Sequence, residues 1–320
     1  MNKQFPTLIP EFYLKLINWD DPKDPLRKMV KFDPREEEIH EYEMADPIGD
    51  NPKTICRGLI HRYPDRVLLN LTNVCAVHCR FCFRKNILGA PAFLNKNDLA
   101  TILKYLKNHK EIWEVIFSGG DPLMIPNKML HDFLEKVNKI THIKIIRFHS
   151  RIPVMNPQMI VKNKFMETVQ KAVPEKQKVI VIHINHPREI TPELKKLVKI
   201  FYKNGFMVMS QTVLLKGVND SEMILANLFK SLFEIGIKPY YLHHLDIARG
   251  THYFRVSIEK GKKILRKLRK KISSACLPKY VIDFPQATGK IQVFSLKKTG
   301  SKTYTANTLR GKKINYIDFA

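Results

Sequence analysis

The chain has 320 residues, 44% of them hydrophobic, which is ample for a sizeable buried core in one large domain or two small ones. Its five cysteines are too sparse for the disulfide framework of a small secreted protein. The formal net charge of +25 suggests a nucleic-acid partner, but the basic residues are scattered, and those at 262–271 alternate with apolar residues as on a solvated amphipathic helix. No direct nucleic-acid partner is therefore predicted.

Residues 1–60 contain several prolines, an acidic run at 36–38 and no strand pattern, so we predict a helical N-terminal extension that wraps the rest of the chain. The first ten residues lack the apolar segment and the small-residue cleavage site of a secretory signal. No segment reaches the apolar length of a membrane span. The expectation is a cytoplasmic protein with no membrane partner.

From residue 67 the chain alternates β-branched apolar runs with segments of helical period. Six such units predict an α/β fold, in which a parallel sheet covered by helices forms a partial (β/α)6 barrel open along one side. The active site of such a barrel lies at the carboxyl ends of the strands. The predicted strands are residues 67–72, 114–118, 144–149, 178–184, 207–214 and 239–245. The predicted helices lie near residues 97–108, 127–139, 157–172, 191–204, 220–235 and 257–273.

Residues 61–275 are therefore assigned to the barrel, and residues 276–320 to a C-terminal segment. This segment begins with a short predicted strand at 279–284 and continues through Gln286-Ala-Thr-Gly289-Lys290. The polar tail after it is predicted to be irregular. The chain shows no internal repeat and no low-complexity tract.

Three cysteines stand close together in the segment Cys75-Ala-Val-His-Cys79-Arg-Phe-Cys82. A [4Fe–4S] cluster normally takes four thiolate ligands, so three thiolates leave one iron open for a small molecule. This spacing resembles that of the radical S-adenosylmethionine (SAM) superfamily, in which the amino and carboxylate groups of SAM chelate the open iron. Two alternatives stay open, a zinc site completed by His61 or His78 and three unrelated core thiols.

The second predicted strand leads into the loop Ser118-Gly119-Gly120-Asp121-Pro122. Glycines at a strand end let the backbone approach a ligand closely. The loop is expected to present its carbonyls and Asp121 to a cationic group such as the ammonium of SAM. The alternative is an ordinary tight turn between a strand and a helix.

In its ordered set of motifs the chain resembles the lysine 2,3-aminomutase family, which includes shorter enzymes that make β-lysine for elongation factor P. The cysteine motif alone is typical of the superfamily, whereas the ordered set is typical of the aminomutase branch. The resemblance covers most of the chain, from about residue 44 to residue 290. The matching stretches are His61-Arg-Tyr-Pro-Asp-Arg66, residues 75–84, residues 117–123, His149-Ser-Arg-Ile-Pro153, His183-Ile-Asn-His186-Pro, residues 211–220 and residues 240–246.

The resemblance implies a second cofactor, pyridoxal phosphate (PLP), held as a Schiff base by Lys290. It also implies that Arg62 and Arg66 bind the PLP phosphate, a task that suits paired guanidinium groups. The alternative for these two arginines is a basic pair on the surface. For Lys290 the alternative is one more solvated lysine in a lysine-rich chain.

The substrate of this family is L-lysine, which carries a carboxylate at one end and an ammonium group at the other. The resemblance implies that Arg84 pairs with the carboxylate, and that Asp246 and Asp283 bind the distal ammonium group. Taken alone, an aspartate at a strand end is as often the cap of the following helix.

On the same pattern, Ser150, His183 and Gln211 are expected to line the SAM pocket together with the loop at 118–122. His243 and His244 follow each other on a predicted strand, so their side chains face opposite sides of the sheet. We predict that one of them faces the pocket and that the other packs in the core.

These features together predict an isomerase that moves the α-amino group of L-lysine to the β-carbon, with a [4Fe–4S] cluster, SAM and PLP as cofactors. A protein reductant of the flavodoxin or ferredoxin type is expected as a partner, and a homo-oligomer is compatible with the sequence.

The biological role is less closely defined than the reaction. The chain ends about thirty residues after Lys290 with no cysteine there, which favours the elongation-factor-P type over the longer enzymes of lysine catabolism. The pair Asp246 and Asp283 looks more like the longer enzymes. Two alternatives come from other classes, a radical SAM enzyme that modifies RNA and a zinc-stabilised binding protein.

Overall fold

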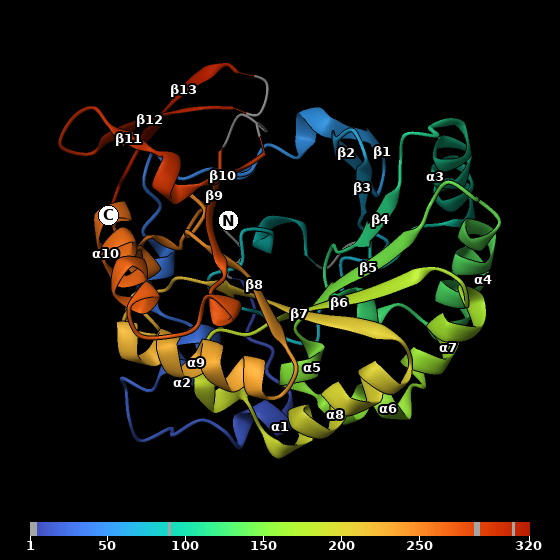
Figure 1. Cartoon of the computed structure of the whole chain (residues 1–320), viewed down its shortest axis with the longest axis horizontal. Helices are drawn as coiled ribbons and strands as arrows, with labels where there is room; N and C mark the ends of the chain where they lie inside the picture. The colour runs from blue at the N-terminus through green and yellow to red at the C-terminus, as the bar shows by residue number, and fades with distance from the viewer. Residues whose placement is uncertain (1–4, 89–90, 285–288, 309–310) are drawn as a thin grey trace.

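The computed structural model describes residues 5–88, 91–284, 289–308 and 311–320, and its central feature is a curved sheet of ten strands (Figure 1). The strands follow one another across the sheet in chain order. β3 to β9 run parallel, β1 and β2 are antiparallel at one edge, and β10 is antiparallel at the other. The strands are β1 (Thr54–Cys56), β2 (Leu59–Tyr63), β3 (Arg66–Leu69), β4 (Glu114–Phe117), β5 (Ile145–Ser150), β6 (Gln177–His183), β7 (Phe206–Val213), β8 (Lys238–His243), β9 (Lys279–Asp283) and β10 (Lys290–Gln292).

The six strands predicted from the sequence correspond to β3 through β8, and the short C-terminal strand corresponds to β9. All four residues of β4 are buried, and so are the five central residues of β6. Such strands are covered on both faces, which is why they appear in the sequence as continuous apolar runs. The predicted α/β partial barrel is confirmed.

Helices cover the outer face of the sheet, and the barrel is open between its two edges (Figure 1). The first turn of α8 has the usual start of a helix, because the side chain of Thr191 accepts a hydrogen bond from Leu194 N and Pro192 opens the helix. The helices are α1 (Glu11–Leu14), α2 (Pro25–Val30), α3 (Lys96–Asn108), α4 (Asn127–Asn138), α5 (Ile152–Met155), α6 (Pro157–Lys162), α7 (Phe165–Ala172), α8 (Pro192–Lys203), α9 (Glu222–Glu234) and α10 (Ile258–Arg269). None of the helices in the described ranges is long and apolar enough to cross a membrane.

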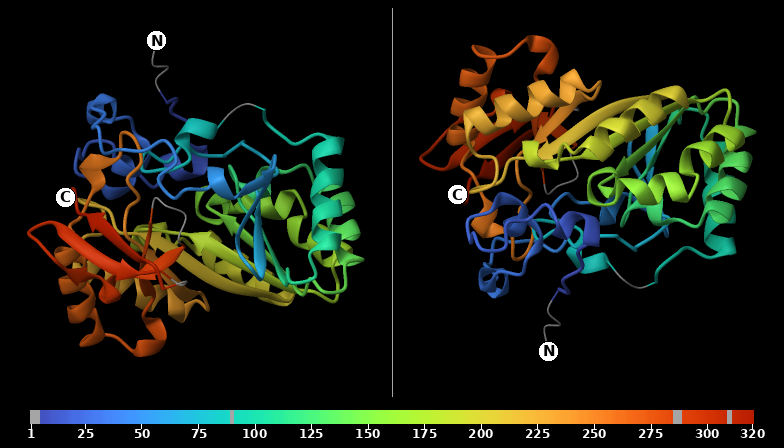
Figure 2. Two further views of the ribbon diagram at one scale, coloured as in Figure 1. Left: turned by 90° about the horizontal axis from the view of Figure 1, so that it is seen from above. Right: turned by 90° about the horizontal axis from the view of Figure 1, so that it is seen from below.

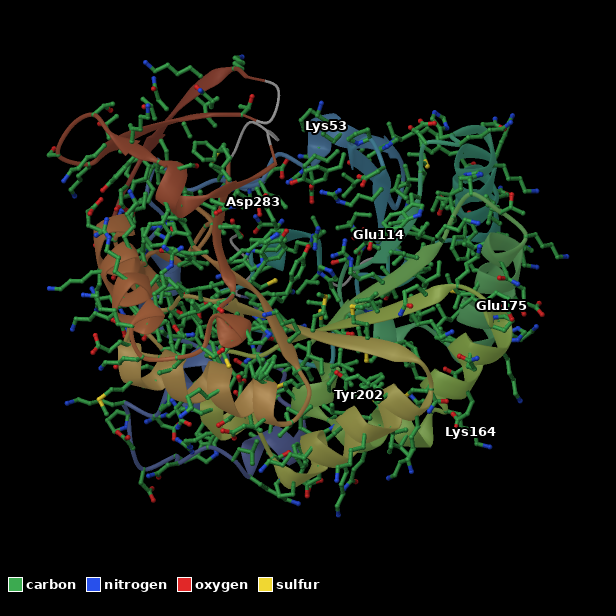
Figure 3. All side chains as sticks on the ribbon, in the orientation of Figure 1. Lys53, Glu114, Lys164, Glu175, Tyr202 and Asp283 are labelled. Carbon is green, nitrogen blue, oxygen red and sulfur yellow. The ribbon has the colours of Figure 1, made fainter. Side chains whose placement is uncertain are left out.

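The single helix predicted over residues 157–172 is wrong, because α6 and α7 are separate helices. Lys164, which lies between them, has a φ of 51°. A left-handed residue cannot continue a right-handed helix, so the chain turns there. Figure 3 shows Lys164 at the outer surface of the molecule, at this turn.

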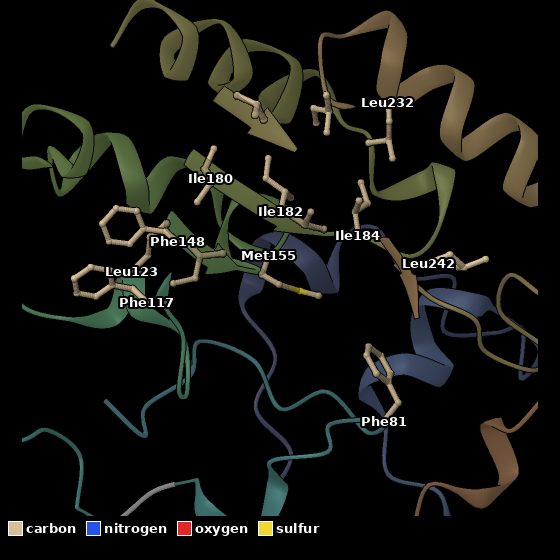
Figure 4. Close-up of a cluster of buried hydrophobic side chains, with 14 of the residues drawn as sticks. Phe81, Phe117, Leu123, Phe148, Met155, Ile180, Ile182, Ile184, Leu232 and Leu242 are labelled. Atoms are coloured by element: carbon tan, nitrogen blue, oxygen red, sulfur yellow. The ribbon is translucent and has the colours of Figure 1, made fainter. Parts of the chain in front are cut away.

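The main core lies between the sheet and its helices, and Figure 4 shows part of it. Phe117 on β4 and Phe148 on β5 stack with ring centroids 4.9 Å apart. Ile180 and Ile182 on β6 are fully buried in the same layer. Burial of each such side chain stabilises the fold by about 1.5–3 kcal/mol. Because side chains alternate along a strand, the residues between these positions face the interior of the barrel.

The N-terminal segment, residues 1–60, is predicted from the sequence to be helical and to lack strands. In its described part it contains helices but also strands, so the second part of that prediction is wrong. β1 lies inside this segment, and β2 begins in it and ends at Tyr63. β2 pairs with β3 through partners such as Ile60 and Leu68. This pairing satisfies backbone groups that β3 would otherwise expose at the edge of the sheet. The expected boundary between residues 60 and 61 falls inside β2.

The prediction of an irregular C-terminal tail is also wrong. Residues 297–317 contain a three-stranded antiparallel sheet, formed by β11 (Lys297–Lys298), β12 (Thr303–Asn307) and β13 (Lys313–Ile317). Tyr304, Ile314 and Tyr316 are buried and alternate with more exposed neighbours. This alternation of polar and apolar residues is visible in the sequence, but each run is only five residues long.

Candidate active site

One cavity of about 270 Å³ lies on the inner side of the barrel, at the carboxyl ends of the parallel strands. All the residues predicted for the site line it, although they come from segments more than 200 residues apart. Figure 3 labels Asp283 at this inner rim, at the end of β9. The predicted residues in the lining are Arg62, Arg66, Cys75, Cys79, Cys82, Arg84, Gly119, Gly120, Asp121, Ser150, His183, Gln211, Asp246, Asp283 and Lys290.

The cysteine loop follows β3 and brings its three thiols to the wall of the cavity. Burial raises the pKa of Cys75 above its usual range and that of Cys82 to about 11. These thiols therefore stay protonated at neutral pH unless a bound cation displaces the proton, as iron does when it coordinates a thiolate. The Arg84 backbone N–H already donates to Cys82 Sγ at 3.4 Å.

The geometry of the loop does not suit the alternative zinc site. One zinc ion with bonds of about 2.3 Å to sulfur needs its ligand atoms within roughly 4 Å of one another. Within the described ranges, the only three His, Cys, Asp or Glu ligand atoms within 4.8 Å of one another belong to His131, Asp132 and Glu135, on α4. Each predicted zinc histidine is bonded elsewhere through one ring nitrogen, since His78 Nδ1 lies 2.8 Å from Pro6 O and His61 Nδ1 lies 2.8 Å from Tyr105 Oη.

The N-terminal segment holds the cysteine loop in place, and Figure 2 shows it packed against one end of the barrel. Arg80 is fully buried, and its guanidinium pairs with the carboxylate of Glu36. The same guanidinium donates to the carbonyls of Phe5 and Pro6 at 3.2 Å. The predicted wrap is therefore part of the support of the site.

The glycines of the loop after β4 approach protein backbone rather than open space. A Cβ on Gly119, whose φ is +102°, would lie 2.5 Å from Thr72 O, and a Cβ on Gly120 would lie 2.3 Å from Val74 O. Gly120 N donates to Thr72 O at 2.8 Å. The two glycines thus let this loop lie directly against the chain that enters the cysteine loop, a role that the sequence analysis did not foresee.

The Asp121 carboxylate is occupied by groups of the protein. It accepts hydrogen bonds from Ser150 Oγ at 2.8 and 3.0 Å, from Arg151 N at 2.8 Å and from Leu123 N at 3.1 Å. Burial raises its pKa to about 6, although these hydrogen bonds act in the opposite direction. Asp121 and Ser150 therefore connect the ends of β4 and β5, and their expected contact with SAM stays a prediction.

Lys290 and Asp283 form an ion pair on the far side of the cavity, with Nζ 2.9 Å from Oδ2. Arg62 Nη1 lies 3.2 Å from the other oxygen of the same carboxylate. Burial alone would raise the pKa of Asp283, but the charges of Lys290, His243 and Arg62 hold it below the usual value. The pKa of Lys290 is raised, since Asp283 outweighs the effect of burial on the amine.

Asp246 lines the same part of the cavity, and no cationic side chain of the described residues forms an ion pair with it. Burial, and next the charge of Asp283, raise its pKa to about 7. The two predicted ammonium ligands are therefore unequal, because one is fully ionised and the other changes its charge near neutral pH.

Two arginines of the cavity, Arg62 and Arg84, share a carboxylate that the sequence analysis missed. Asp50 pairs with Arg62 through one oxygen, and its other oxygen lies 3.1 Å from Arg84 Nη2. Arg84 Nη1 also donates to Ser118 Oγ at 3.0 Å. Arg66 pairs with the exposed Asp65 at 2.6 Å. No motif in the sequence marks Asp50, because its role depends on two distant arginines.

Several histidines lie at the cavity. His149 and His183 are half-buried there, and the buried Nε2 of each has no hydrogen-bond partner among the residues that the structure describes. Burial lowers the pKa of both rings, so both are neutral. His243 lines the cavity, whereas His244 Nδ1 lies 3.0 Å from the hydroxyl of the buried Tyr280. The prediction that these two adjacent histidines face opposite sides is confirmed.

A family model described as the radical SAM superfamily matches residues 69–229. A putative L-lysine 2,3-aminomutase from Aquifex aeolicus is 38% identical, over 98% of this chain and 84% of its own length. The chain belongs to the L-lysine 2,3-aminomutase family. Enzymes of that name from Escherichia coli and Methanococcus maripaludis are 35% and 36% identical over 87% and 90% of this chain, and over 80% and 66% of their own lengths.

Membership of the aminomutase family makes the protein a radical SAM isomerase, and it replaces the RNA-modifying and zinc-binding alternatives. The residues present fit the [4Fe–4S] cluster that this superfamily requires. Cys75, Cys79 and Cys82 supply three sulfurs in one wall of the cavity, and a cluster with three protein ligands keeps one iron for SAM.

Proposed function

We propose that the protein is an L-lysine 2,3-aminomutase that uses PLP and SAM to convert L-lysine to β-lysine. The observation that carries the proposal is the position of Lys290, whose amine lines the same cavity as the three cluster cysteines. A lysine amine is the group that PLP enzymes use to hold their cofactor. In this cavity the amine lies beside a carboxylate, Asp283, that suits the ammonium group of a bound lysine.

The charges of the cavity fit the anionic groups of PLP and of an amino acid. Six lysine or arginine side chains line it, compared with four aspartates and no glutamate. Among the described carboxylates, a bound phosphate would compete for Arg66 only with Asp65, and this ion pair is weak because Asp65 is half exposed. A phosphate dianion is well matched to guanidinium donors. We assign Arg62 and Arg66 to the PLP phosphate and Lys290 to its aldehyde.

When bound, the cluster and SAM supply radical chemistry, and PLP supplies a conjugated ring that stabilises the migrating amino group. The protein binds the two ends of the substrate. Arg84 is assigned to the α-carboxylate, while Asp246 and Asp283 are assigned to the distal ammonium group. The ammonium takes the place beside Asp283 that Lys290 Nζ occupies in this structure. Because charged side chains bind the substrate at both ends, it can bind in only one orientation.

The SAM pocket is assigned to the loop at 118–120 and to His183 and Gln211, which line the cavity near the cysteines. The Nε2 of His183, which has no hydrogen-bond partner in the described ranges, is available to a ligand. Ser150 and Asp121 keep the ends of β4 and β5 together beneath this pocket. The walls also exclude water, through apolar residues such as Val77 and Leu245.

For the biological role we propose the supply of β-lysine to elongation factor P, with lysine catabolism as the second candidate. The support is the resemblance of the ordered motifs to a family that includes the shorter enzymes of this role. The electron donor is proposed to be of the flavodoxin or ferredoxin type. We expect the two roles to require opposite product enantiomers, so the stereochemistry of the product distinguishes them.

The test is anaerobic incubation of iron-reconstituted protein with L-lysine, SAM, PLP and dithionite, followed by chiral analysis of the amino acids. β-Lysine is the expected product, and its enantiomer assigns the role. Cys82→Ala is the matched control and should form none. If fully clustered, PLP-loaded protein makes no β-lysine, the proposal is wrong.

The PLP anchor is tested independently of turnover. Borohydride reduction of PLP-loaded protein, followed by peptide mass spectrometry, should place the cofactor mass on Lys290. A neighbouring lysine outside the cavity, Lys297, serves as the comparison site because it is exposed on β11. Cofactor mass on any other lysine would reject the assignment.

A further inference from the structure

Arg151 is a buried arginine that contacts one of the cluster cysteines and has no place in the assignments above. Its Nη1 donates to Cys79 Sγ at 2.8 Å, and its Nη2 donates to Glu189 Oε1 at 2.9 Å. The guanidinium also lies over the ring of Phe81, 5.2 Å from its centroid. Only 4% of the residue is exposed to solvent.

The surroundings of Arg151 fix its orientation. Its backbone N–H donates to Asp121 Oδ2 at 2.8 Å, which ties it to the loop after β4. The partner carboxylate, Glu189, is fully buried and accepts further hydrogen bonds from Tyr13 Oη at 2.8 Å and from Asn185 N at 2.6 Å. Because arginine keeps its charge under all ordinary conditions, a fixed cation points at Cys79 Sγ.

Hydrogen bonds to the ligand sulfurs, net charge and exposure set the reduction potential of an iron–sulfur cluster. We infer that Arg151 raises the reduction potential of the cluster through its hydrogen bond to Cys79 Sγ, and so acts as a positioning and tuning residue. One electron passes from an external reductant, such as dithionite, to the cluster. No bond forms or breaks and no proton moves in this step. The added negative charge is stabilised by the guanidinium.

The Arg151–Glu189 pair has a simpler explanation as a structural salt bridge that joins α1, β5 and the loop after β6. A purely structural pair would change stability but would leave the electronic properties of the cluster unchanged. The two explanations therefore differ in the reduction potential. The inference rests on cluster binding by the three cysteines and is independent of the substrate, so its failure is distinguishable from failure of the proposed function.

The test is potentiometric titration of the reconstituted cluster without lysine, monitored by electron paramagnetic resonance. Removal of Arg151 alone would leave Glu189 charged and unpaired in the interior, which is strongly destabilising. The variant is therefore Arg151→Met with Glu189→Gln. We expect the one-electron reduction equilibrium to become at least tenfold less favourable, which corresponds to a potential lower by 59 mV. Arg151→Lys keeps the charge and should shift it less.

The matched control is Arg147→Met with Glu114→Gln, which removes another buried ion pair, 2.6 Å long, that has no hydrogen bond to a sulfur. Glu114 is the first residue of β4, at the opposite end of that strand from the loop that contacts the cysteine segment, and Arg147 lies within β5. Its removal should change the reduction equilibrium by less than threefold. An equal shift in both pair variants, or a shift below threefold in the Arg151 pair variant at full iron content, would overturn the inference.

A second measurement needs no substitution and applies even if the variant does not retain its cluster. Wild-type protein is prepared with arginine labelled with ¹⁵N only in the guanidinium group, and its reduced cluster is studied by pulsed electron paramagnetic resonance. A hydrogen bond at 2.8 Å to a ligand sulfur predicts a resolved ¹⁵N hyperfine coupling. The coupling should vanish in Arg151→Lys. Absence of any coupling in the wild type would overturn the inference.

Discussion

Lys290 and Asp283 are direct partners in the antiparallel pair of β10 and β9, and Nζ lies 2.9 Å from Oδ2. The other oxygen of Asp283 pairs with Arg62 at the opposite edge of the sheet. One carboxylate thus joins the two edges of the open barrel at the place where we assign PLP and the substrate ammonium. Asp283 is the last residue of β9, and Lys290 is the first residue of β10.

Asp283→Asn tests the assignment of the distal ammonium group. A charge-assisted hydrogen bond contributes about 1.5–3 kcal/mol, so the affinity for L-lysine should fall by roughly 10- to 150-fold. Norleucine has the same carbon chain without the ammonium group and should lose little affinity. The measurement is the dissociation constant of each ligand with PLP-loaded protein. An equal loss for both ligands would contradict the assignment.

Asp246 predicts a specific pH dependence of lysine binding. Its pKa of about 7 means that the side chain is neutral below pH 7 and ionised above it. Only the ionised form attracts an ammonium group, so the dissociation constant of lysine should rise about tenfold for each pH unit below 7. Binding titrations from pH 5.5 to 8.5 measure this slope. In Asp246→Asn the slope should disappear, and a persistent slope would assign the titration to another group.

Gly120→Ala tests the contact between the loop after β4 and the cysteine loop. The new Cβ would lie 2.3 Å from Val74 O, so one of the two loops must move. Overpacking of this kind costs about 1–3 kcal/mol, and we expect a lower denaturation midpoint and a lower iron content after reconstitution. Gly300→Ala is the control, because its nearest neighbour, Thr303 Oγ1, would lie at an ordinary 3.5 Å. Full iron binding by Gly120→Ala would show that the close contact is dispensable.

The cluster assignment separates the five cysteines into two groups. Cys75→Ala, Cys79→Ala and Cys82→Ala should each lose most of the bound iron and the visible absorbance of the cluster. Cys56→Ala should retain both, since this half-buried thiol does not line the cavity. Iron and sulfide analysis of anaerobically reconstituted proteins gives the answer. Iron retention in any of the first three variants would remove that cysteine from the ligand set.

Arg62→Met should be among the most destabilising substitutions in the site. It leaves Asp50 and Asp283 without the arginine that they share in a nearly buried environment. Loss of one partner of a buried ion pair costs about 3–5 kcal/mol. Arg57→Met removes a solvent-exposed pair with Asp98, 3.4 Å long, and should cost less than about 1 kcal/mol. Urea unfolding of both variants measures the difference, and similar losses would refute the argument.

The sequence predicted the local features of the site well. The cysteine loop, the glycine loop and the strands β3 to β8 are continuous segments, so their patterns are readable without the fold. The same reasoning failed for β2 and β12, which are short strands with a weak pattern. They form because their backbone groups pair with those of a neighbouring strand, β3 for β2 and β13 for β12. This reasoning also did not foresee that Gly119 and Gly120, which line the cavity, make room for the backbone of residues 72–74.

The sequence by itself determined the cofactor class and the order of strands and helices, because ligand spacing and hydrophobic period are properties of short segments. Only the tertiary structure decided which charges share a partner. Arg62 and Asp283 are 221 residues apart in the chain, and Arg151 and Cys79 are 72 apart. Hydrogen bonds and ion pairs act over a few ångströms, so these pairs exist only once the strands have assembled into the partial barrel.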